Sequence, residues 1–313
     1  MESNIAADYK FGDGWVATIE LLYSKDINAI YHDNIGLYRT EQFVNDGGAG
    51  NARPYYNGYY SDREGNQKAA NHVVMLRNTS KGHSLYTTFQ LQKNFVDGIL
   101  KGLYLNGSYS FGQSRGVTDG TSSVATSAWK YRAALDGNAE EVGYTAGSFD
   151  GRLLLSASYT ANWSKYAATS FGLIYQRYRP FRYSYCYNGD ANGDSQFSND
   201  LMYIPANFDE VKDHLLPGDF DSQEDAWKAM NAFIEQDPYL SKHRGEYAER
   251  NGAVAPFANQ LDLSVSHDIK IYQKNGRSHT LRFSFNIANF LNLLNRNWGV
   301  VQTTVWVISN ISS

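Results

Sequence analysis

Two stretches near the end of the chain decide the fold: LDLSVSHDIKI at residues 261–271 and TLRFSFNI at residues 280–287. In both, apolar residues alternate with polar ones, which places all apolar side chains of an extended strand on one face. Lys274, Asn275 and Gly276 lie between them and have turn character. The two stretches are therefore predicted to form an antiparallel hairpin with one apolar and one polar face.

The same alternation recurs through the chain, with turns expected at 97–98 and 162–165. We expect strands in these segments: 83–95, 103–111, 153–162, 171–175, 181–187 in the same phase beyond Pro180, and a last one at 305–307. The segment 71–79 is also strand-like, and it fits an even number of spans only if it pairs within a loop.

Alternation alone is also typical of soluble antiparallel sheets, so length and aromatic placement decide the class. The runs are about 10–14 residues long, against a mean of about 5–6 in soluble sheets. Aromatic residues lie near the ends of the runs: Trp15, Phe95, Phe111, Trp163, Tyr175 and Phe290. Membrane-spanning strands need about 9–11 residues and carry aromatic girdles at both interfaces. We therefore predict an all-β fold, a transmembrane antiparallel β-barrel.

The connections alternate between short turns and long segments, as in outer-membrane barrels with short periplasmic turns and long external loops. The predicted external loops are about 35–82, 113–150 and 189–256. Within 189–256, Trp227, Met230 and Phe233 have helical spacing after a capping-box pattern at Ser222. This helical insert either packs as a cap over the loops or binds a partner.

Composition excludes several classes of protein. The chain has 313 residues, a net charge of −4 and 15% aromatic residues. This charge argues against a nucleic-acid partner, and the aromatic content argues against disorder. No run approaches the ~20 apolar residues of a membrane helix. Cys186 is the single cysteine, which excludes an internal disulfide, and the first residues, Met1 to Asn4, have no signal-peptide character.

Several motifs in the last 120 residues are similar to those of one family of membrane receptors. They are NDLMYIP at 199–205, YLSKHRG at 239–245, RNG at 250–252, PF at 256–257 and FNIANFLNLLN at 285–295, followed by WG at 298–299. In this order and spacing the motifs resemble the C-terminal part of a TonB-dependent outer-membrane receptor of the SusC/Oar-like type of Bacteroidetes. The resemblance covers 83–300 well and 1–82 loosely.

The resemblance implies a receptor and transporter in the outer membrane of a Gram-negative bacterium that imports a large nutrient such as a glycan or a peptide. Its implied partners are the lipid bilayer, the TonB complex, reached through a plug domain, and a surface lipoprotein. Such barrels have about 22 strands, and about eight spans are recognisable here, so the resemblance also implies a fragment. Nothing in the chain resembles the plug or its TonB box.

One acidic loop has the residue types of a calcium site. Asp190, Asn192 and Asp194 place oxygen ligands at alternate positions around a turn, as in the first half of an EF-hand loop. Ser195 stands where that loop has glycine, and no glutamate follows at the twelfth position. The segment is therefore either a calcium site or an Asx/Gly turn on a solvated loop.

The preceding aromatic segment is the candidate ligand-binding site. Tyr183, Tyr185 and Tyr187 fall on one phase of the predicted strand, where their rings could stack on a sugar. The alternatives are an aromatic girdle or the core of the loop region. Cys186 lies on the other phase and reads as a buried or lumen-facing small residue.

No set of residues predicts catalysis, so we expect a protein that is not an enzyme. The stretch Gly112–Gly116 matches the letters of a nucleophile elbow, but a loop follows it where that motif needs a helix. The seven histidines form no close pair or metal motif. The alternative to a membrane receptor is a soluble, secreted β-sandwich that binds carbohydrate or acts in adhesion, and a third reading is an outer-membrane enzyme.

Overall fold

The computed structural model of the chain describes residues 1–44, 53–61, 64, 66–69, 73–120, 122–272 and 278–302. Half of the chain is strand, at 50%, and 11% is helix, which confirms the predicted antiparallel β class. The long strands are β1 (Glu2–Phe11), β2 (Trp15–Lys25), β9 (His83–Asn94), β10 (Leu103–Gly116), β12 (Phe149–Ser164), β13 (Ala167–Tyr178), β18 (Ala258–Tyr272) and β19 (Ser278–Ile287).

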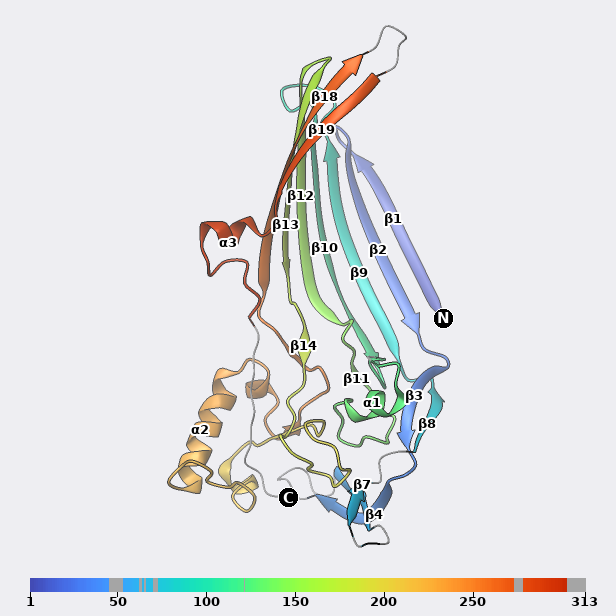
Figure 1. Cartoon of the computed structure of the whole chain (residues 1–313), viewed down its shortest axis with the longest axis vertical. Coiled ribbons are helices and arrows are strands. Elements are labelled where there is room, and N and C mark those ends of the chain that lie inside the picture. Colours follow the sequence, from blue (N-terminus) through green and yellow to red (C-terminus); the bar gives the residue numbers. More distant parts are fainter. Residues whose placement is uncertain are drawn as a thin grey trace.

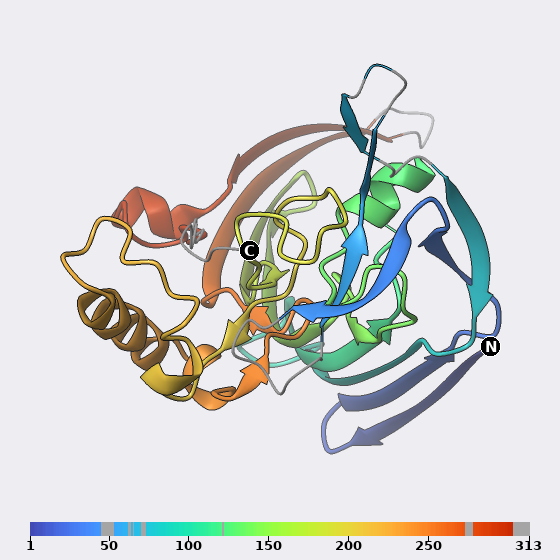
Figure 2. The same cartoon turned by 90° about the horizontal axis from the view of Figure 1, so that it is seen from below.

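These strands form one sheet in which every neighbouring pair is antiparallel. The order is β1-β2-β9-β10-β12-β13-β18-β19, and the short β11 (Gly143–Tyr144) adds to the end of β10. The sheet is open, because β1 and β19 lie at its two edges and do not pair with each other (Figure 1). Figure 2 shows the same sheet as an arc that curves from β1 round to β19. The described residues therefore do not close into a barrel, which corrects the prediction of a barrel on this point.

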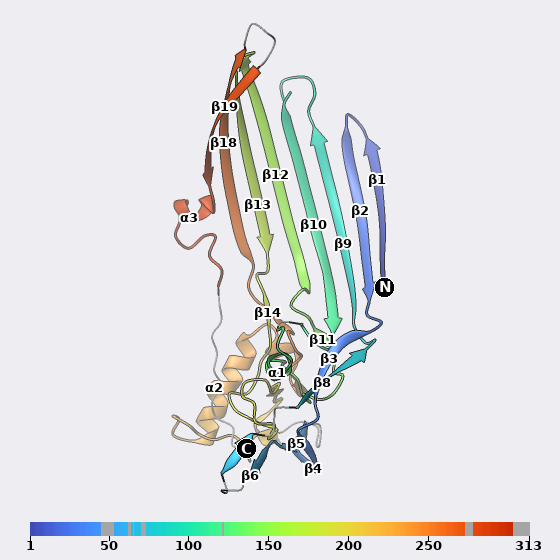
Figure 3. The same cartoon turned by 45° about the vertical axis from the view of Figure 1, so that its right-hand side comes forward.

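Short and long connections lie at opposite ends of the sheet (Figure 3). The described short ones are 12–14, 95–102 and 165–166, and the long ones are 26–82, 117–148 and 179–257. The predicted turn at 97–98 is thus longer than two residues. The first long loop ends at its predicted limit of 82 but begins at 26 instead of 35, the second is 117–148 instead of 113–150, and the third is 179–257 instead of 189–256. The turn expected at 274–276 and the strand expected at 305–307 lie outside the described residues.

The strand predicted to continue beyond Pro180 is wrong. β13 ends at Tyr178, and the following segment makes only the two-residue β14 (Arg182–Tyr183) and an isolated bridge between Cys186 and Leu201. Proline has no N–H to donate to a neighbouring strand, so the ladder ends here. The segment then leaves the sheet and enters the loops.

The three long connections form the loop cluster, which contains the short elements of the fold. Its strands are β3 (Ala29–Asn34), β4 (Tyr38–Val44), β5 (Arg53–Asn57), β6 (Tyr59–Ser61), β7 (Gln67–Ala69), β8 (Val74–Thr79), β11, β14, β15 (Tyr203–Ile204), β16 (Glu246–Tyr247) and β17 (Ala253–Val254). Its helices are α1 (Ala125–Lys130), η1 (Phe208–Glu210), α2 (Gln223–Gln236) and η2 (Leu240–Lys242). β8 pairs with β3 inside the first loop, as the parity argument for 71–79 required.

The hydrophobic core belongs to the loop cluster and not to the sheet. One buried group joins Met202, Ile204, Ile234 and Leu240, and a second joins Val211 and Leu215, which follow η1, with Ala226 of α2. The predicted helix in this region is α2, and the Ser222 side chain caps it by accepting a hydrogen bond from the Asp225 N–H. The apolar stripe of α2 therefore packs inward, as the cap reading of the insert expected.

Candidate functional site

The first candidate site is the apolar face of the sheet. Strand register aligns one row of side chains across seven strands: Tyr9, Ala17, Leu91, Gly107, Leu155, Tyr175 and Leu261. A second row runs through Tyr159, Phe171, Val265 and Phe285 and reaches β19. The period-two alternation of each strand is thus kept in phase from edge to edge, which makes one continuous apolar face.

No second layer of protein covers this face in the described part of the chain. Its large side chains stay open to solvent, with Phe89 46% exposed, Phe171 44% and Phe283 58%. Such a large contiguous apolar surface is rare on soluble monomers and marks contact with a membrane or a partner. Two shallow hollows interrupt the face, where Gly107 and Ala157 supply no long side chain.

The opposite face of the same strands is polar, and hydrogen bonds between side chains join neighbouring strands on it. Gln90 Nε2 donates to Asn106 Oδ1 at 2.8 Å, and Thr88 and Ser110 share a bond of 2.9 Å between their hydroxyls. These bonds join side chains on neighbouring strands, so they add to the backbone ladder. The face is polar without a strong charge over the middle strands, which suits contact with water or with a polar ligand.

Among the described residues, no helix has the length and hydropathy needed to cross a membrane.

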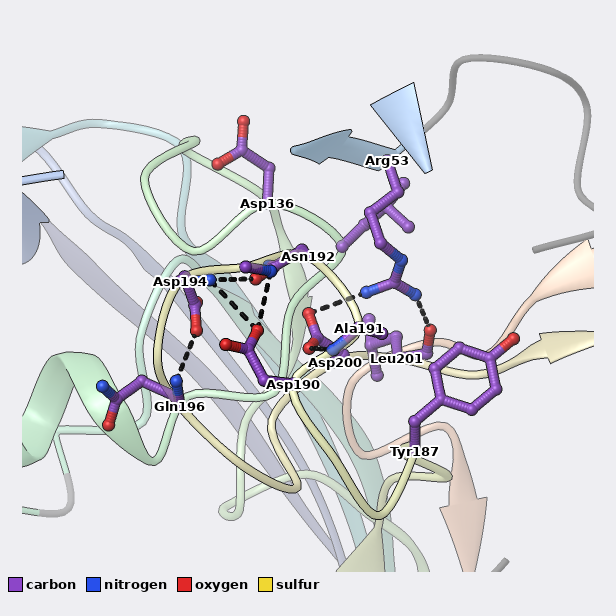
Figure 4. A network of polar contacts seen from close by, with 12 residues as sticks. Arg53, Asp136, Tyr187, Asp190, Ala191, Asn192, Asp194, Gln196, Asp200 and Leu201 are labelled. Carbon is purple, nitrogen blue, oxygen red and sulfur yellow. Dashed lines mark hydrogen bonds and ion pairs between the residues drawn. The ribbon is translucent and has the colours of Figure 1, made fainter. Parts of the chain in front are cut away.

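The second candidate site is the polar network that locks the three long loops together (Figure 4). Arg53 is fully buried, and its guanidinium pairs with Asp200 Oδ1 at 2.8 Å and also donates to the Leu201 carbonyl. The same guanidinium lies over the rings of Tyr187 and Tyr247, at 5.5 and 5.4 Å from their centroids. One side chain of the first loop thereby holds two segments of the third.

Backbone bonds and one bond between side chains complete this junction. The Tyr56 N–H donates to the Asn192 carbonyl at 2.7 Å, and the Tyr56 hydroxyl donates to Asp136 Oδ1 at 2.6 Å. Ala134 of the second loop exchanges bonds with Asn199 and Leu201. All three loops therefore meet at one place and are joined there by hydrogen bonds.

Two further buried arginines act through backbone carbonyls instead of carboxylates. Arg132 and Arg250 both donate to the Val117 carbonyl, at 3.0 and 2.6 Å, and each also bonds to other carbonyls of the second loop. Burial lowers the pKa of Arg132 to about 10, and that of Arg250 is lowered for the same reason. Their role in this arrangement is to satisfy carbonyls that the loops leave unpaired.

The structure places the three predicted ligand-binding tyrosines in and around the core of the loop cluster. Tyr185 and Tyr187 are buried, and Tyr183 is half-buried against Tyr185. The Tyr185 hydroxyl donates to Asp237 Oδ2 at 2.6 Å, and the Tyr187 hydroxyl accepts a bond from the Tyr203 N–H. Stacking of Tyr185 or Tyr187 on a sugar would require the loop cluster to open, so sugar binding by this group stays a prediction.

The structure brings together the predicted calcium ligands Asp190, Asn192 and Asp194, whose side chains turn into the same loop in Figure 4. Asp190 Oδ1 accepts bonds from the N–H groups of Gly193 and Asp194, and its Oδ2 accepts one from Ser195. Asn192 Oδ1 accepts a bond from the Asp194 N–H at 3.0 Å. The segment is therefore an Asx turn, with much of its oxygen capacity used by the loop itself.

The described residues contain no group of three or more His, Cys, Asp or Glu side chains that is arranged to hold a metal ion. Any cation at this loop would therefore need amide, carbonyl or water oxygens besides carboxylates. The stretch Gly112–Gly116 lies at the end of β10, paired with β9, and not at a turn into a helix. It lacks the geometry of a nucleophile elbow.

Arg53, Asp136 and Arg132 were not recognised as site residues in the sequence, although each is central to the loop junction. Arg53 and Asp200 are 147 positions apart, and no local pattern links them.

Comparison of the chain with known protein families, with characterised proteins and with solved structures finds no match.

Proposed function

We propose that this chain forms a section of the wall of a β-barrel in a bacterial outer membrane, with the apolar face of the sheet against lipid. The observation that carries the proposal is the uncovered apolar face, kept in register over all eight long strands. In water such a face costs free energy roughly in proportion to its area, whereas lipid tails remove that cost.

Strand length supports this placement. β12 has 16 residues and β18 has 15, and the shortest long strands have 10. A tilted strand crosses a bilayer in about 9–11 residues. Each long strand is therefore able to span the hydrocarbon layer, and the longer ones continue into the loop cluster.

Aromatic residues support the position of one interface. Phe11 and Trp15 stack beside the turn at 12–14, with ring centroids 6.5 Å apart. Trp163 lies just before the turn at 165–166 and Tyr166 lies in it, and the two side chains are 67% and 48% exposed. Both turns are short connections, at the end of the sheet away from the loop cluster (Figure 3). Tyr and Trp favour the headgroup level of a membrane, so these turns would lie at the periplasmic surface.

The two edges of the sheet indicate that more strands take part in the wall. All ten residues of β1 are exposed, and β19 is exposed along almost its whole length. Long unpaired edges present free N–H and carbonyl groups, which lipid cannot satisfy. In the proposed assembly, further strands pair with β1 and β19 and close the wall.

The motifs at 199–205, 239–245 and 285–295 make this wall similar to that of a TonB-dependent receptor of the SusC/Oar-like type. We propose that the complete receptor imports a large nutrient, such as a glycan or a peptide, by gated passage and without catalysis. The loop cluster would face the outside, where a surface lipoprotein could dock. Energy would come from the TonB complex through a plug domain that lies inside the barrel, against the polar face of the sheet.

The rival proposal is a soluble, secreted β-sandwich that binds carbohydrate. A sandwich needs a second sheet packed about 10 Å from the apolar face. The other sheets of the described chain have two strands each, and they belong to the loop cluster. This observation favours the membrane wall.

Site-directed spin labelling tests the proposal on adjacent residues of one strand. Leu155 and Ser156 of β12 lie on opposite faces, and each would be replaced by a labelled cysteine in a Cys186→Ala chain, expressed in full and isolated with its outer membrane. We expect the label at 155 to be relaxed by oxygen dissolved in lipid, and the label at 156 by a water-soluble nickel chelate. Equal accessibility of both labels to the chelate, or recovery of the chain in the periplasm without detergent, would contradict the proposal.

A further inference from the structure

Asp194 has one carboxylate oxygen without a hydrogen-bond donor in a buried place. The residue is 1% exposed, and its Oδ1 accepts a bond from the Gln196 N–H at 2.8 Å. Its Oδ2 is inaccessible to solvent and has no hydrogen-bond partner among the residues that the structure describes. Buried polar atoms are nearly always paired, so an unpaired buried carboxylate oxygen indicates a place where a ligand binds.

A second unpaired oxygen lies beside it. Asn199 is 5% exposed, and in the described part of the chain its Oδ1 also lacks a hydrogen-bond partner. The Asn199 side chain also makes a hydrogen-bonding contact with the Asp194 carboxylate, so the two residues adjoin. Two buried acceptors that lack a partner among the described residues therefore belong to adjoining side chains.

The structure also leaves room next to Asp194 Oδ2. A methyl group built on Gly137 would sit 3.6 Å from Asp194 Oδ2 and 3.5 Å from Cζ2 of Trp129, which are ordinary contact distances. The absent side chain of Gly137 thus leaves a gap between the indole ring and the unpaired oxygen. This gap has space for a small ion or a water molecule.

The charge around the gap is negative. Asp190, Asp194 and Asp200 approach one another in the loop junction (Figure 4), and Arg53 is the guanidinium that faces them through its pair with Asp200. Three carboxylates against one guanidinium leave an excess of negative charge where water is scarce.

We propose that Asp194 Oδ2 and Asn199 Oδ1 bind a calcium ion in the gap at Gly137. Calcium takes six to eight oxygen ligands in flexible geometry and accepts carboxylate, amide, carbonyl and water oxygens together. Zinc would need nitrogen or sulfur ligands, and the described residues offer no such group here. Asp190 and Asn192 shape the turn and add negative potential. With few charged ligands, the affinity falls in the range of extracellular modules, about 10⁻⁴–10⁻³ M.

Calcium titration of the full chain in detergent micelles is the test, with calorimetry and thermal unfolding as readouts. We expect heat of binding and a higher unfolding midpoint with calcium at about 10 mM, and a smaller effect with magnesium. Asp194→Asn should lose the calcium response, yet in chelator it should be at least as stable as the unaltered chain, because it removes a buried charge and gives Asn199 a donor. Asp268→Asn, in an exposed ion pair on the sheet, should keep the full response.

Terbium luminescence locates the ion independently of stability. Terbium replaces calcium and is excited by a nearby indole, and Trp129 borders the gap. We expect terbium emission when tryptophan is excited, and we expect added calcium to reduce it by displacing terbium. Asp194→Asn should abolish the emission. Trp129→Phe should also remove it, but should keep the rise in unfolding midpoint that calcium causes. Absence of a calcium response in the unaltered chain, or an unchanged response in Asp194→Asn, would overturn the proposal.

Discussion

In the sheet, large apolar side chains such as Phe89 and Phe171 face outward, whereas in the loop cluster Arg53, Asp194 and Asp200 are almost completely buried. The sheet is held by backbone ladders and by polar bonds on one face, and neither cluster of buried apolar residues found in the described chain belongs to it. The loop cluster has an apolar core and a buried ion pair, like a small soluble domain. The comparison shows that apolar side chains of one chain face outward in the sheet and inward in the loop cluster, which agrees with the proposal that the sheet lies in lipid and the loops lie in water.

The two regions should differ most in the stability that is lost when one partner of an ion pair is removed. Arg53→Met leaves Asp200 buried without its cation, which costs about 3–5 kcal/mol for buried pairs. We expect the loop cluster to open in this variant, as measured by denaturant titration of Trp129 fluorescence and by limited proteolysis.

The matched control is the pair of Arg282 with Asp268 on the sheet. Arg282 is 63% exposed, and exposed pairs contribute little because water screens them. Arg282→Met should leave unfolding unchanged. Adding Asp200→Asn to Arg53→Met should recover part of the lost stability, since it removes the stranded charge. An equal loss in both single variants would break the distinction between the two regions.

The rate of thiol alkylation should be about a thousandfold lower in the loop cluster than on the polar face of the sheet. Burial raises the pKa of the Cys186 thiol from 9.0 to about 12, so at pH 8 its thiolate fraction is about a thousand times smaller than that of an ordinary thiol. A Ser156→Cys thiol on the polar face of the sheet, in a Cys186→Ala chain, should react with iodoacetamide at an ordinary rate. Comparable rates for the two thiols would show that water reaches Cys186.

The same shift predicts how stability depends on pH. Between pH ~9 and ~12 the folded chain keeps the Cys186 proton that the unfolded chain loses. The folded state then binds more protons, so the free energy of unfolding falls as pH rises through this range. Cys186→Ala should flatten this part of the curve, which denaturant titrations at several pH values would measure.

A positive charge placed on either face of β13 should test the sheet. Phe171→Arg puts a guanidinium on the apolar face near the middle of the strand, which costs about 2–4 kcal/mol in a transmembrane barrel. Ser170→Arg puts it on the polar face, where we expect a small change. Unfolding by guanidinium of the chain in lipid vesicles is the measurement, and similar losses at both positions would contradict a lipid-facing surface.

Sequence predicted the sheet better than the loops because strand pattern is local. Alternation at 261–271 and 280–287 fixes which face of each strand is apolar, and a register slip by one residue would invert it. The junction of Arg53 with Asp200 depends on residues 147 positions apart, and a single sequence has no signal for it. The packing of the loops therefore could not be predicted from the sequence and is known only from the contacts in the structure.

The failure at Pro180 shows a limit of the same reasoning. Phe181, Tyr183, Tyr185 and Tyr187 continue the alternation of β13, yet the chain has left the sheet. Alternate side chains of any extended segment lie on opposite sides, and here one side packs into the core of the loop cluster. Period two thus reports an extended backbone, and the proline indicated that the ladder had ended.

The smallest effect we expect concerns the start of α2, where loop stability depends on a single side chain. The Ser222 hydroxyl accepts a hydrogen bond from the Asp225 N–H at 3.1 Å, one of the N–H groups that a helix start leaves unpaired. Ser222→Ala removes that acceptor and costs about 1 kcal/mol, whereas Ser222→Asn keeps a capping oxygen. Hydrogen exchange at the first turn of α2 should accelerate about fivefold in Ser222→Ala alone. Because α2 packs on the apolar core through Ile234, the change should stay within the loop cluster and leave the exchange of β12 and β13 unaltered, and acceleration in these strands would mean that sheet and loops unfold as one unit.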